Sequence, residues 1–182
     1  MILFVPYLNP FVALDRKKIS FLKPWQSAKS VNTIDPGALY DWGVRAVGFD
    51  FDQTLAPYGA ETVSLFAADA VKKFKNVFGD RLCVISNARS GRVAEAAGRI
   101  DLAVVIETAE KPSARAFLSA ERYFGMPAGQ CAYVGDRYLT DTLGANLAGW
   151  KSILVDPLDP PSDPVAVRIV RIYENYLAKF IK

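Results

Sequence analysis

The sequence predicts a doubly wound α/β fold: a five-stranded parallel sheet with helices on both faces, in a single domain spanning 1–182. First, the chain has 182 residues, of which 51% are hydrophobic, a size and composition typical of one globular domain. Second, short and almost continuously apolar runs recur over residues 45–156. Third, these runs alternate four times with helical patterns, which is the order expected of a parallel sheet.

Five apolar runs predict the strands. None alternates strictly between apolar and polar residues, so both faces of the sheet are expected to be covered. In chain order the runs are VRAVGF before Asp50, RLCVI before Ser86, LAVVIE ending at Glu107, CAYV before Gly135 and SILV before Asp156.

Helical periodicity fills the intervals between these runs. Residues 62–78 carry apolar side chains at the spacing of one helix face, which predicts a helix packed on the sheet. Further helical patterns follow Arg89, Pro112 and Arg137. The predicted buried face of the first helix consists of Val63, Phe66, Ala67, Ala70, Val71, Phe74 and Phe78.

Both ends of the chain are basic and apolar. Residues 1–30 contain five Lys or Arg against one acid, and residues 165–182 contain four against one, whereas 31–164 contain thirteen against seventeen. Neither end has an unbroken apolar run long enough to span a bilayer, and the start lacks the basic region of a secretory signal. The acidic middle disfavours nucleic acid as a partner. We therefore expect an apolar, basic N-terminal segment over 1–30 and a basic amphipathic helix over 165–182.

This last helix has two interpretations. It packs on its own domain, or it lies on an anionic lipid surface, where each nearby cation contributes about 1 kcal/mol. Its pattern places Arg168, Arg171, Asn175, Lys179 and Lys182 on one side and Ile169, Tyr173, Tyr176 and Phe180 on the other.

Composition limits the chemistry. The chain has no histidine, which excludes Ser-His-Asp triads, Cys-His pairs and His-ligated zinc. Its two cysteines, Cys83 and Cys131, lie within apolar runs, as small buried residues do, and indicate a reducing compartment. Catalysis must then come from carboxylates, hydroxyls, Lys, Arg or thiols.

Polar residues follow the first four predicted strands. In parallel sheets, ligands bind beyond the carboxyl ends of the strands, where the strand order reverses. We expect one site there, formed by Asp50 and Asp52, then Ser86 and Asn87, then Lys111, then Asp136 and Asp141.

The acid pair Asp50 and Asp52 predicts a metal-assisted reaction. Two nearby carboxylates repel each other unless a cation lies between them or one is protonated. Mg²⁺ prefers such oxygen ligands and keeps several waters, so Asp50 and Asp136 are expected to bind it. With Lys111 and Ser86 holding a phosphoryl group, Asp50 could act as nucleophile and Asp52 as general acid and base.

Four short motifs occur in this order over residues 45–156, and together they resemble the haloacid dehalogenase (HAD) superfamily of phosphatases. They are Asp50-x-Asp52-x-Thr54, Ser86-Asn87, Lys111-Pro112, and Gly135-Asp136 followed by Thr140-Asp141. The resemblance implies a HAD-like (Rossmannoid) fold and an aspartyl-phosphate intermediate. It assigns catalysis to Asp50, Asp52 and Lys111, and phosphate binding to Thr54, Ser86, Asn87 and Lys111. It assigns Mg²⁺ binding to Asp50, Asp136 and the main-chain carbonyl of Asp52, and support of the metal site to Asp141.

A second resemblance, over about residues 33–182, is to the YqeG-like and mitochondrial phosphatidylglycerophosphate phosphatases. It depends on Lys111-Pro112, on GDRYLTDTLGANLAGW over 135–150 and on the basic C-terminal segment. The chain departs from these families at Gln53, where they often have Asn, and at Ala88, where bacterial members often have Asn.

These resemblances imply a lipid substrate. The intervals from Asp52 to Ser86 and from Ser86 to Lys111 are too short for a cap domain, and an uncapped site suits a phosphate presented on a membrane. Arg137 would contact a second anionic group of the headgroup. We expect a cytoplasmic protein, peripheral on the inner membrane face, or on the mitochondrial matrix side in a eukaryote, with phospholipid and an anionic membrane surface as partners.

Four alternatives remain open. The chain could be a soluble phosphatase of sugar or nucleotide phosphates, or a lipid-binding protein without catalysis. The run from Cys83 to Ser90 fits the Cys-x5-Arg-Ser pattern of cysteine phosphatases, although it offers no glycine to cradle a phosphate. A response-regulator receiver domain would need a phosphorylated Asp after a later strand, and none follows LAVVI.

Overall fold

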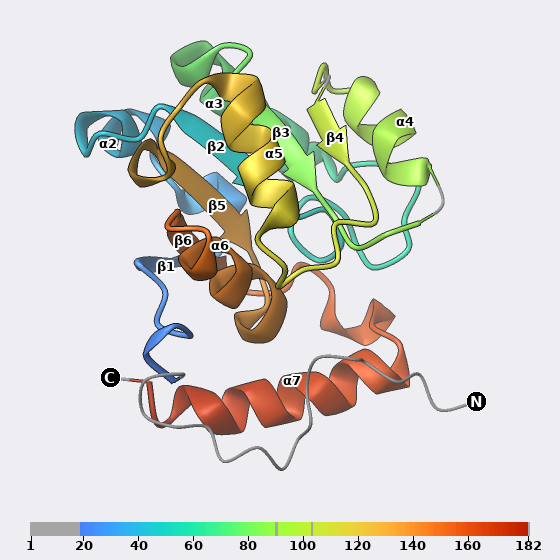
Figure 1. Ribbon diagram of the computed structural model, residues 1–182. Helices are drawn as coiled ribbons and strands as arrows, with labels where there is room; N and C mark the ends of the chain where they lie inside the picture. The colour runs from blue at the N-terminus through green and yellow to red at the C-terminus, as the bar shows by residue number, and fades with distance from the viewer. Residues whose placement is uncertain (1–18, 90, 103, 182) are drawn as a thin grey trace.

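The computed structural model describes residues 19–89, 91–102 and 104–181, and within them it confirms the α/β class (Figure 1). In the described part of the chain, six strands form one sheet in the order β1-β6-β5-β2-β3-β4, and all neighbouring strands in it are parallel. The five predicted strands are present. Their bounds are β2 Ala46–Phe49, β3 Leu82–Ile85, β4 Val104–Ile106, β5 Cys131–Gly135 and β6 Lys151–Val155.

The predicted number of strands is wrong, because a sixth strand, β1 (Gln26–Ala28), pairs with β6 at the edge of the sheet. Its three residues are only partly buried or exposed. An edge strand of this kind buries little side-chain surface, so its sequence contains no apolar run that could reveal it.

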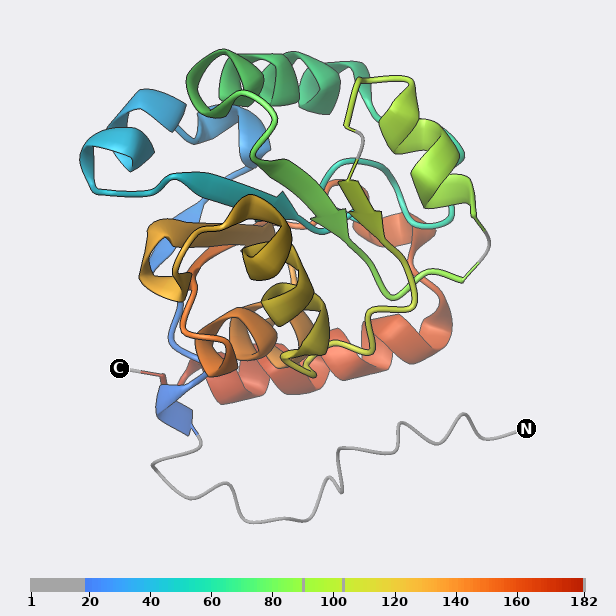
Figure 2. The ribbon, with the colours of Figure 1, turned by 45° about the horizontal axis from the view of Figure 1, so that its top comes forward.

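Helices cover both faces of the sheet. On one face, α3 (Leu65–Phe78) and α4 (Arg92–Gly98) pack on a core in which the rings of Phe49 and Phe74 meet edge to face, 5.1 Å apart. On the other face, Phe117 lies between Tyr133 and Trp150. The helices of this second face are α5 (Arg115–Phe124) and α6 (Leu143–Leu147), and a short helix, α2 (Pro36–Asp41), precedes β2 (Figure 2).

The helix predicted over 62–78 begins at Leu65, where the Ser64 hydroxyl caps it by accepting a hydrogen bond from the Ala67 amide. Five of its seven predicted core residues are buried. The other two are Val63, which precedes the helix and is only partly buried against the core, and Phe66, which is 73% exposed. Phe66 lies in the first turn and points away from the core, whereas its neighbour Ala67 is buried.

The strand order creates the crevice in which the site lies. β2 is central, with β3 on one side and β5 on the other. After β3 the chain passes to the face covered by α4, and after β5 it passes to the opposite face, covered by α6. Between Asp52 and Ser86 the chain forms a loop and α3, and between Ser86 and Lys111 it forms α4 and β4. The expected lack of a cap domain stays a prediction.

The last helix, α7 (Val165–Ala178), belongs to neither layer. It runs past the carboxyl end of the sheet, across the side on which the strand-end loops gather (Figures 1 and 2). No helix in the described part of the chain is long and apolar enough to span a bilayer. Of the N-terminal segment predicted over 1–30, residues 1–18 lie outside the described residues.

Candidate active site

The predicted residues gather around one pocket at the carboxyl end of the sheet. The pocket has a volume of about 490 Å³. Seven of the predicted site residues line it: Asp50, Asp52, Ser86, Asn87, Lys111, Asp136 and Arg137. The other two lie directly behind, because Thr54 donates to Asp136 at 3.5 Å and Asp141 accepts from Lys111.

Lys111 is the centre of this arrangement. Its ammonium is buried and donates three hydrogen bonds of 2.7 Å, to Asp50 Oδ1, Asp141 Oδ1 and the Tyr133 hydroxyl. The Tyr133 hydroxyl in turn donates to the carbonyl of Ile85 at 2.6 Å. All three ammonium protons are therefore used, which fixes the cation beside Asp50.

The loop after β3 positions both Ser86 and Lys111. The Asn87 side chain accepts a hydrogen bond from the Lys111 amide at 2.8 Å and donates one to the Lys111 carbonyl at 3.2 Å. This pair of hydrogen bonds joins the two loops in the way that a pair of main-chain hydrogen bonds joins two strands. Ser86 is buried, and its hydroxyl oxygen accepts from the Ala88 amide. Because that oxygen already has a donor, the hydroxyl proton is available to a ligand in the pocket.

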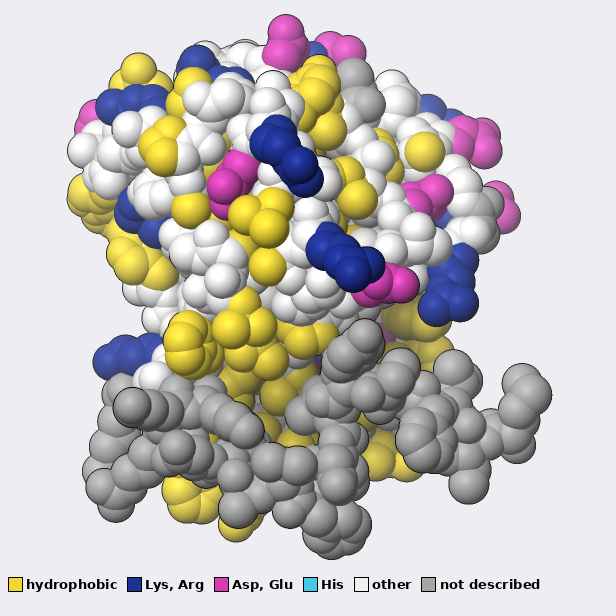
Figure 3. Space-filling view, viewed as in Figure 1, with side chains coloured by type: hydrophobic (Ala, Val, Ile, Leu, Met, Phe, Trp, Pro, Cys, Tyr) yellow, Lys and Arg dark blue, Asp and Glu magenta, His cyan; other side chains and the backbone are white. Residues whose placement is uncertain are grey.

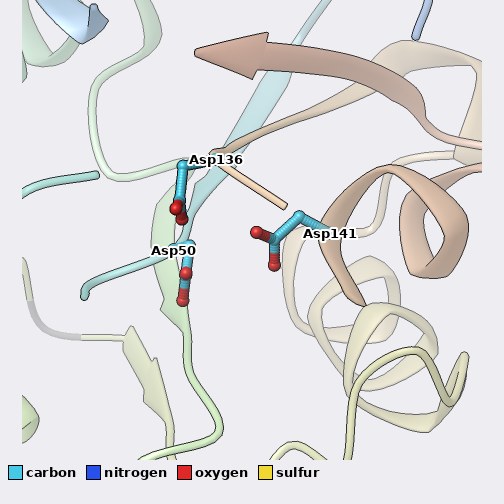
Figure 4. Close-up of side chains that lie close together, drawn as sticks. All are labelled: Asp50, Asp136 and Asp141. Atoms are coloured by element: carbon cyan, nitrogen blue, oxygen red, sulfur yellow. The ribbon is translucent and has the colours of Figure 1, made fainter. Parts of the chain in front are cut away.

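Three buried carboxylates, Asp50, Asp136 and Asp141, come together beside Lys111 (Figure 4). One oxygen from each lies within 4.8 Å of the others. A glycine precedes Asp136 because a Cβ at Gly135 would lie 2.5 Å from the side chain of Asp141. The close approach of these chain segments therefore depends on this glycine.

Burial is the largest influence on the ionisation of this cluster. It raises the pKa of Asp50 to about 7 against the opposing charge of Lys111. It raises the pKa of Asp136 to about 8, with repulsion from Asp141 and Asp50 adding to the effect. Burial lowers the pKa of Lys111, but Asp141 and Asp50 outweigh it, so the net shift is upward and the ammonium stays charged.

The donor set suits a hard divalent cation. Carboxylate oxygens are the ligands that Mg²⁺ prefers, and three of them lie within 4.8 Å of one another here. After burial, repulsion from Asp141 and Asp50 raises the pKa of Asp136, and a bound cation would offset that repulsion. The geometry adds Asp141 to the oxygens within reach of an ion, whereas the carboxylate of Asp52 points elsewhere.

Asp52 is held by Arg92, the first residue of α4. One guanidinium nitrogen of Arg92 donates to both carboxylate oxygens of Asp52, at 2.7 and 2.6 Å, and the Gly59 amide donates to one of them at 2.9 Å. The other terminal nitrogen of Arg92 donates to the carbonyl of Ala60 at 2.8 Å. Asp52 thus has a fixed position on the pocket wall.

A second arginine reaches the cluster from α7. Arg171 donates to Asp136 Oδ2 at 2.5 Å and to Asp163 Oδ2 at 2.5 Å. Asp163 also accepts from the buried side chain of Gln53 at 2.8 Å, and Gln53 further bonds the main chain of Asp159 in both directions. Gln53, one of the two residues at which the chain departs from the families it resembles, therefore ties the loop after β2 to the chain before α7.

The predicted phosphate ligand Arg137 also meets α7. Its Nε donates to Glu174 at 2.7 Å, and the amide of Leu139 donates to the same carboxylate at 2.9 Å. Glu174 is buried. Arg137 lines the pocket, but its guanidinium is already paired with the Glu174 carboxylate. Its phosphate-binding role stays a prediction.

Sequence reasoning missed five residues that position the site: Tyr133, Arg92, Asp163, Arg171 and Glu174. It considered only residues directly after strands, whereas these lie within a strand, in helices or in the proline-rich stretch. Tyr133 alone had a signal, a polar group in a buried strand that needs a partner.

The geometry does not support the cysteine-phosphatase alternative. Cys83 lies inside β3 and is fully buried in the core beneath α5. Burial raises its pKa strongly, so the thiolate needed for that chemistry is disfavoured.

Comparisons with solved structures agree with the fold. A protein from Listeria monocytogenes serotype 4b, described as uncharacterized, superposes with a TM-score of 0.52 at 13% identity, over 71% of this chain and 99% of its own. The cobalt-bound deoxy-D-mannose-octulosonate 8-phosphate phosphatase from Haemophilus influenzae superposes with a TM-score of 0.51 at 17% identity, over 70% of this chain and 74% of its own. At these identities the likeness concerns the fold alone.

Sequence comparisons identify the family. Phosphatidylglycerophosphate phosphatase 1, chloroplastic/mitochondrial, from Arabidopsis thaliana is 30% identical over 90% of this chain, and the chloroplastic protein of that name from Chlamydomonas reinhardtii is 29% identical over 86%. The match spans 49% and 61% of those two relatives. Probable phosphatase YqeG from Bacillus subtilis (strain 168) is 27% identical over 89% of this chain and 92% of its own. The family model for mitochondrial PGP phosphatase matches residues 12–159. The chain therefore belongs to the mitochondrial PGP phosphatase family, which is of the HAD-superfamily phosphatase type.

Proposed function

We propose that this chain is a Mg²⁺-dependent phosphomonoester hydrolase that dephosphorylates phosphatidylglycerophosphate at a membrane surface. The observation that carries the proposal is the contact of Lys111 with Asp50 and Asp141 at the pocket, beside Asp136. The plant and algal relatives are named phosphatidylglycerophosphate phosphatases, which supports the substrate. The lipid tails of such a substrate agree with action as a peripheral protein, on the inner face of a membrane or on the mitochondrial matrix side.

In the first half of the reaction, a carboxylate oxygen of Asp50 attacks phosphorus and the bond from phosphorus to the ester oxygen breaks. Lys111 holds Asp50 in place and, with the hydroxyl of Ser86, stabilises the charge on the phosphoryl oxygens. Asp52, when protonated, gives its proton to the leaving alkoxide. The product of this half is an aspartyl phosphate on Asp50 and a free alcohol.

In the second half, Asp52 accepts a proton from a water that attacks phosphorus. The bond between phosphorus and Asp50 breaks, and inorganic phosphate leaves. Asp50 and Asp136, with Asp141 nearby and the main-chain carbonyl of Asp52, would hold Mg²⁺, which neutralises phosphate charge when bound. Thr54, Asn87 and Arg137 support the phosphate or the loops around it.

The direct test is phosphate release from phosphatidylglycerophosphate in vesicles and from a panel of soluble esters, with Mg²⁺ and with EDTA. The wild type is compared with Asp50→Asn. We expect Mg²⁺-dependent release from the lipid, lost in Asp50→Asn at unchanged thermal stability. Release that survives EDTA, or that Asp50→Asn retains, would contradict the mechanism. Equal turnover of a soluble aryl phosphate and the lipid would contradict the substrate.

A further inference from the structure

The side of α7 that faces the protein is partly charged and partly apolar. Its charged residues Arg171 and Glu174 bind Asp136, Asp163 and Arg137 there. Leu177 is buried on the same side, with Val170 and Tyr173 packed beside it. Other large apolar side chains of the helix are left exposed.

The division into a basic and an apolar side that the sequence pattern predicts is wrong. Arg168 and Lys179 are exposed together with Ile169, Tyr176 and Phe180, whereas Tyr173 packs inward. Arg171 also faces inward, because two buried carboxylates bind it there.

The outward side chains form a continuous row, which we call the outer stripe. Its members recur three or four residues apart, and between 53% and 70% of the surface of each is exposed. Hydrophobic side chains are visible at this end of the molecule in Figure 3. The outer stripe consists of Val165, Ile169, Ile172, Tyr176 and Phe180.

The orientation of this stripe is fixed by strong contacts on the opposite side. Glu174 is buried and holds both Arg137 and the amide of Leu139. Turning the helix to bury its exposed apolar side would leave Glu174, Asp136 and Asp163 without these partners, and removing one partner of a buried ion pair is strongly destabilising. The exposed stripe is therefore a stable surface of the folded chain, and such surfaces mark interaction sites.

The charge around the stripe selects its partner. Arg168 and Lys179 are exposed beside it, whereas the single acid of α7, Glu174, is buried and paired. A second copy of the chain would present the same cations and would meet the helix with like charge. The apolar residues 1–14 carry no charged side chain, so they offer these cations no partner. An anionic lipid surface offers apolar depth and opposite charge together.

We infer that the outer stripe of α7 is the surface through which this protein docks on anionic lipid bilayers, an inference that refines the proposed function. Two residues of the same helix, Val167 and Arg171, line the pocket. A helix lying in the headgroup layer thus brings the pocket to the depth at which a lipid phosphomonoester is exposed.

The test measures binding to vesicles by sedimentation, independently of catalysis. The variant Ile169→Gln with Ile172→Gln removes two apolar side chains from the stripe and touches no pocket residue. The matched control is Leu65→Gln with Phe66→Gln, because these two apolar side chains are also exposed but belong to α3. Vesicles contain phosphatidylcholine alone or with phosphatidylglycerol.

We expect the wild type and the α3 control to bind vesicles with phosphatidylglycerol, and the α7 variant to bind them at least tenfold more weakly. Binding by the wild type to phosphatidylcholine alone should be weak. Turnover of a soluble aryl phosphate should be the same in all three proteins, which shows that the α7 variant is folded.

Three results would overturn the inference: equal vesicle binding by the α7 variant and the wild type, an equal loss in the α3 control, or a dimer in sedimentation velocity that the α7 substitutions dissociate. Vesicle binding separates this inference from the proposed function, because it is measured without catalysis. If the docking surface is correct and the catalytic proposal is wrong, vesicle binding depends on α7 while none of the proteins releases phosphate.

Discussion

Two cations reach the acidic cluster from different parts of the chain. Lys111 comes from the loop after β4 and binds Asp50 and Asp141. Arg171 comes from α7 and binds Asp136 and Asp163. The first belongs to a set of strand ends that the sheet itself brings together, and the second depends on how a helix at the end of the chain packs across that set. We conclude that the sheet brings together the groups that we propose to react, whereas α7 packs across them and adds a second cation.

The largest expected effect is from Lys111→Met. This change removes the ammonium that holds Asp50, and we expect kcat/KM to fall by about a thousandfold or more, comparable to the loss of a main electrostatic group. The control is Lys75→Met, which breaks the exposed ion pair with Asp101 and should leave kcat/KM unchanged. Activity within tenfold of the wild type in Lys111→Met would remove Lys111 from the mechanism.

Arg171→Met tests the second cation. Two buried carboxylates, Asp136 and Asp163, would lose their partner, so we expect the free energy of unfolding to fall by about 3 kcal/mol. Chemical denaturation measures this effect. In the matched variant Arg99→Met, only an exposed pair with Glu95 is lost, and the change should stay below about 0.5 kcal/mol. Equal effects of the two substitutions would show that α7 is not fastened through Arg171.

The same comparison explains what the sequence can predict. Each strand is an apolar run, and in a parallel sheet strand ends converge whatever the details of packing, so Asp50, Ser86, Lys111 and Asp136 were predictable from position alone. Arg171 and Glu174 were not, because a helical pattern shows that a helix has two sides and not which side faces inward. The inward side of α7 is chosen by buried carboxylates far away in the sequence.

Gln53 and β1 are two further features that could not be predicted from the sequence. Gln53 has a left-handed backbone conformation, φ 66°, and its side chain bonds residues near 160. Such a contact leaves no periodic trace in the sequence. β1 is an edge strand of three residues whose pairing with β6 requires little burial, so no hydrophobic signal accompanies it.

Arg92→Met tests a third cation, which holds Asp52 from α4 at the wall of the pocket. We expect kcat to fall about ten- to a hundredfold, as for residues that orient a catalytic group, with little change in KM. Arg92→Lys should restore part of the activity, since it keeps the charge but loses the contact with Ala60. A rise in KM at constant kcat would instead assign Arg92 to substrate binding.

The smallest effect is the pH dependence of thermal stability without metal. Burial raises the pKa of Asp50 to about 7 and that of Asp136 to about 8, so between about pH 4 and 8 the native state holds more protons than the unfolded state. Stability must then fall as the pH rises through this window, and we expect Tm to be lower at pH 8 than at pH 5. Mg²⁺ binds the ionised carboxylates, so it should raise Tm more at pH 8 than at pH 5. Asp136→Asn should reduce both dependences, whereas an increase in Tm with pH in EDTA would mean that Lys111 and Arg171 already neutralise the cluster.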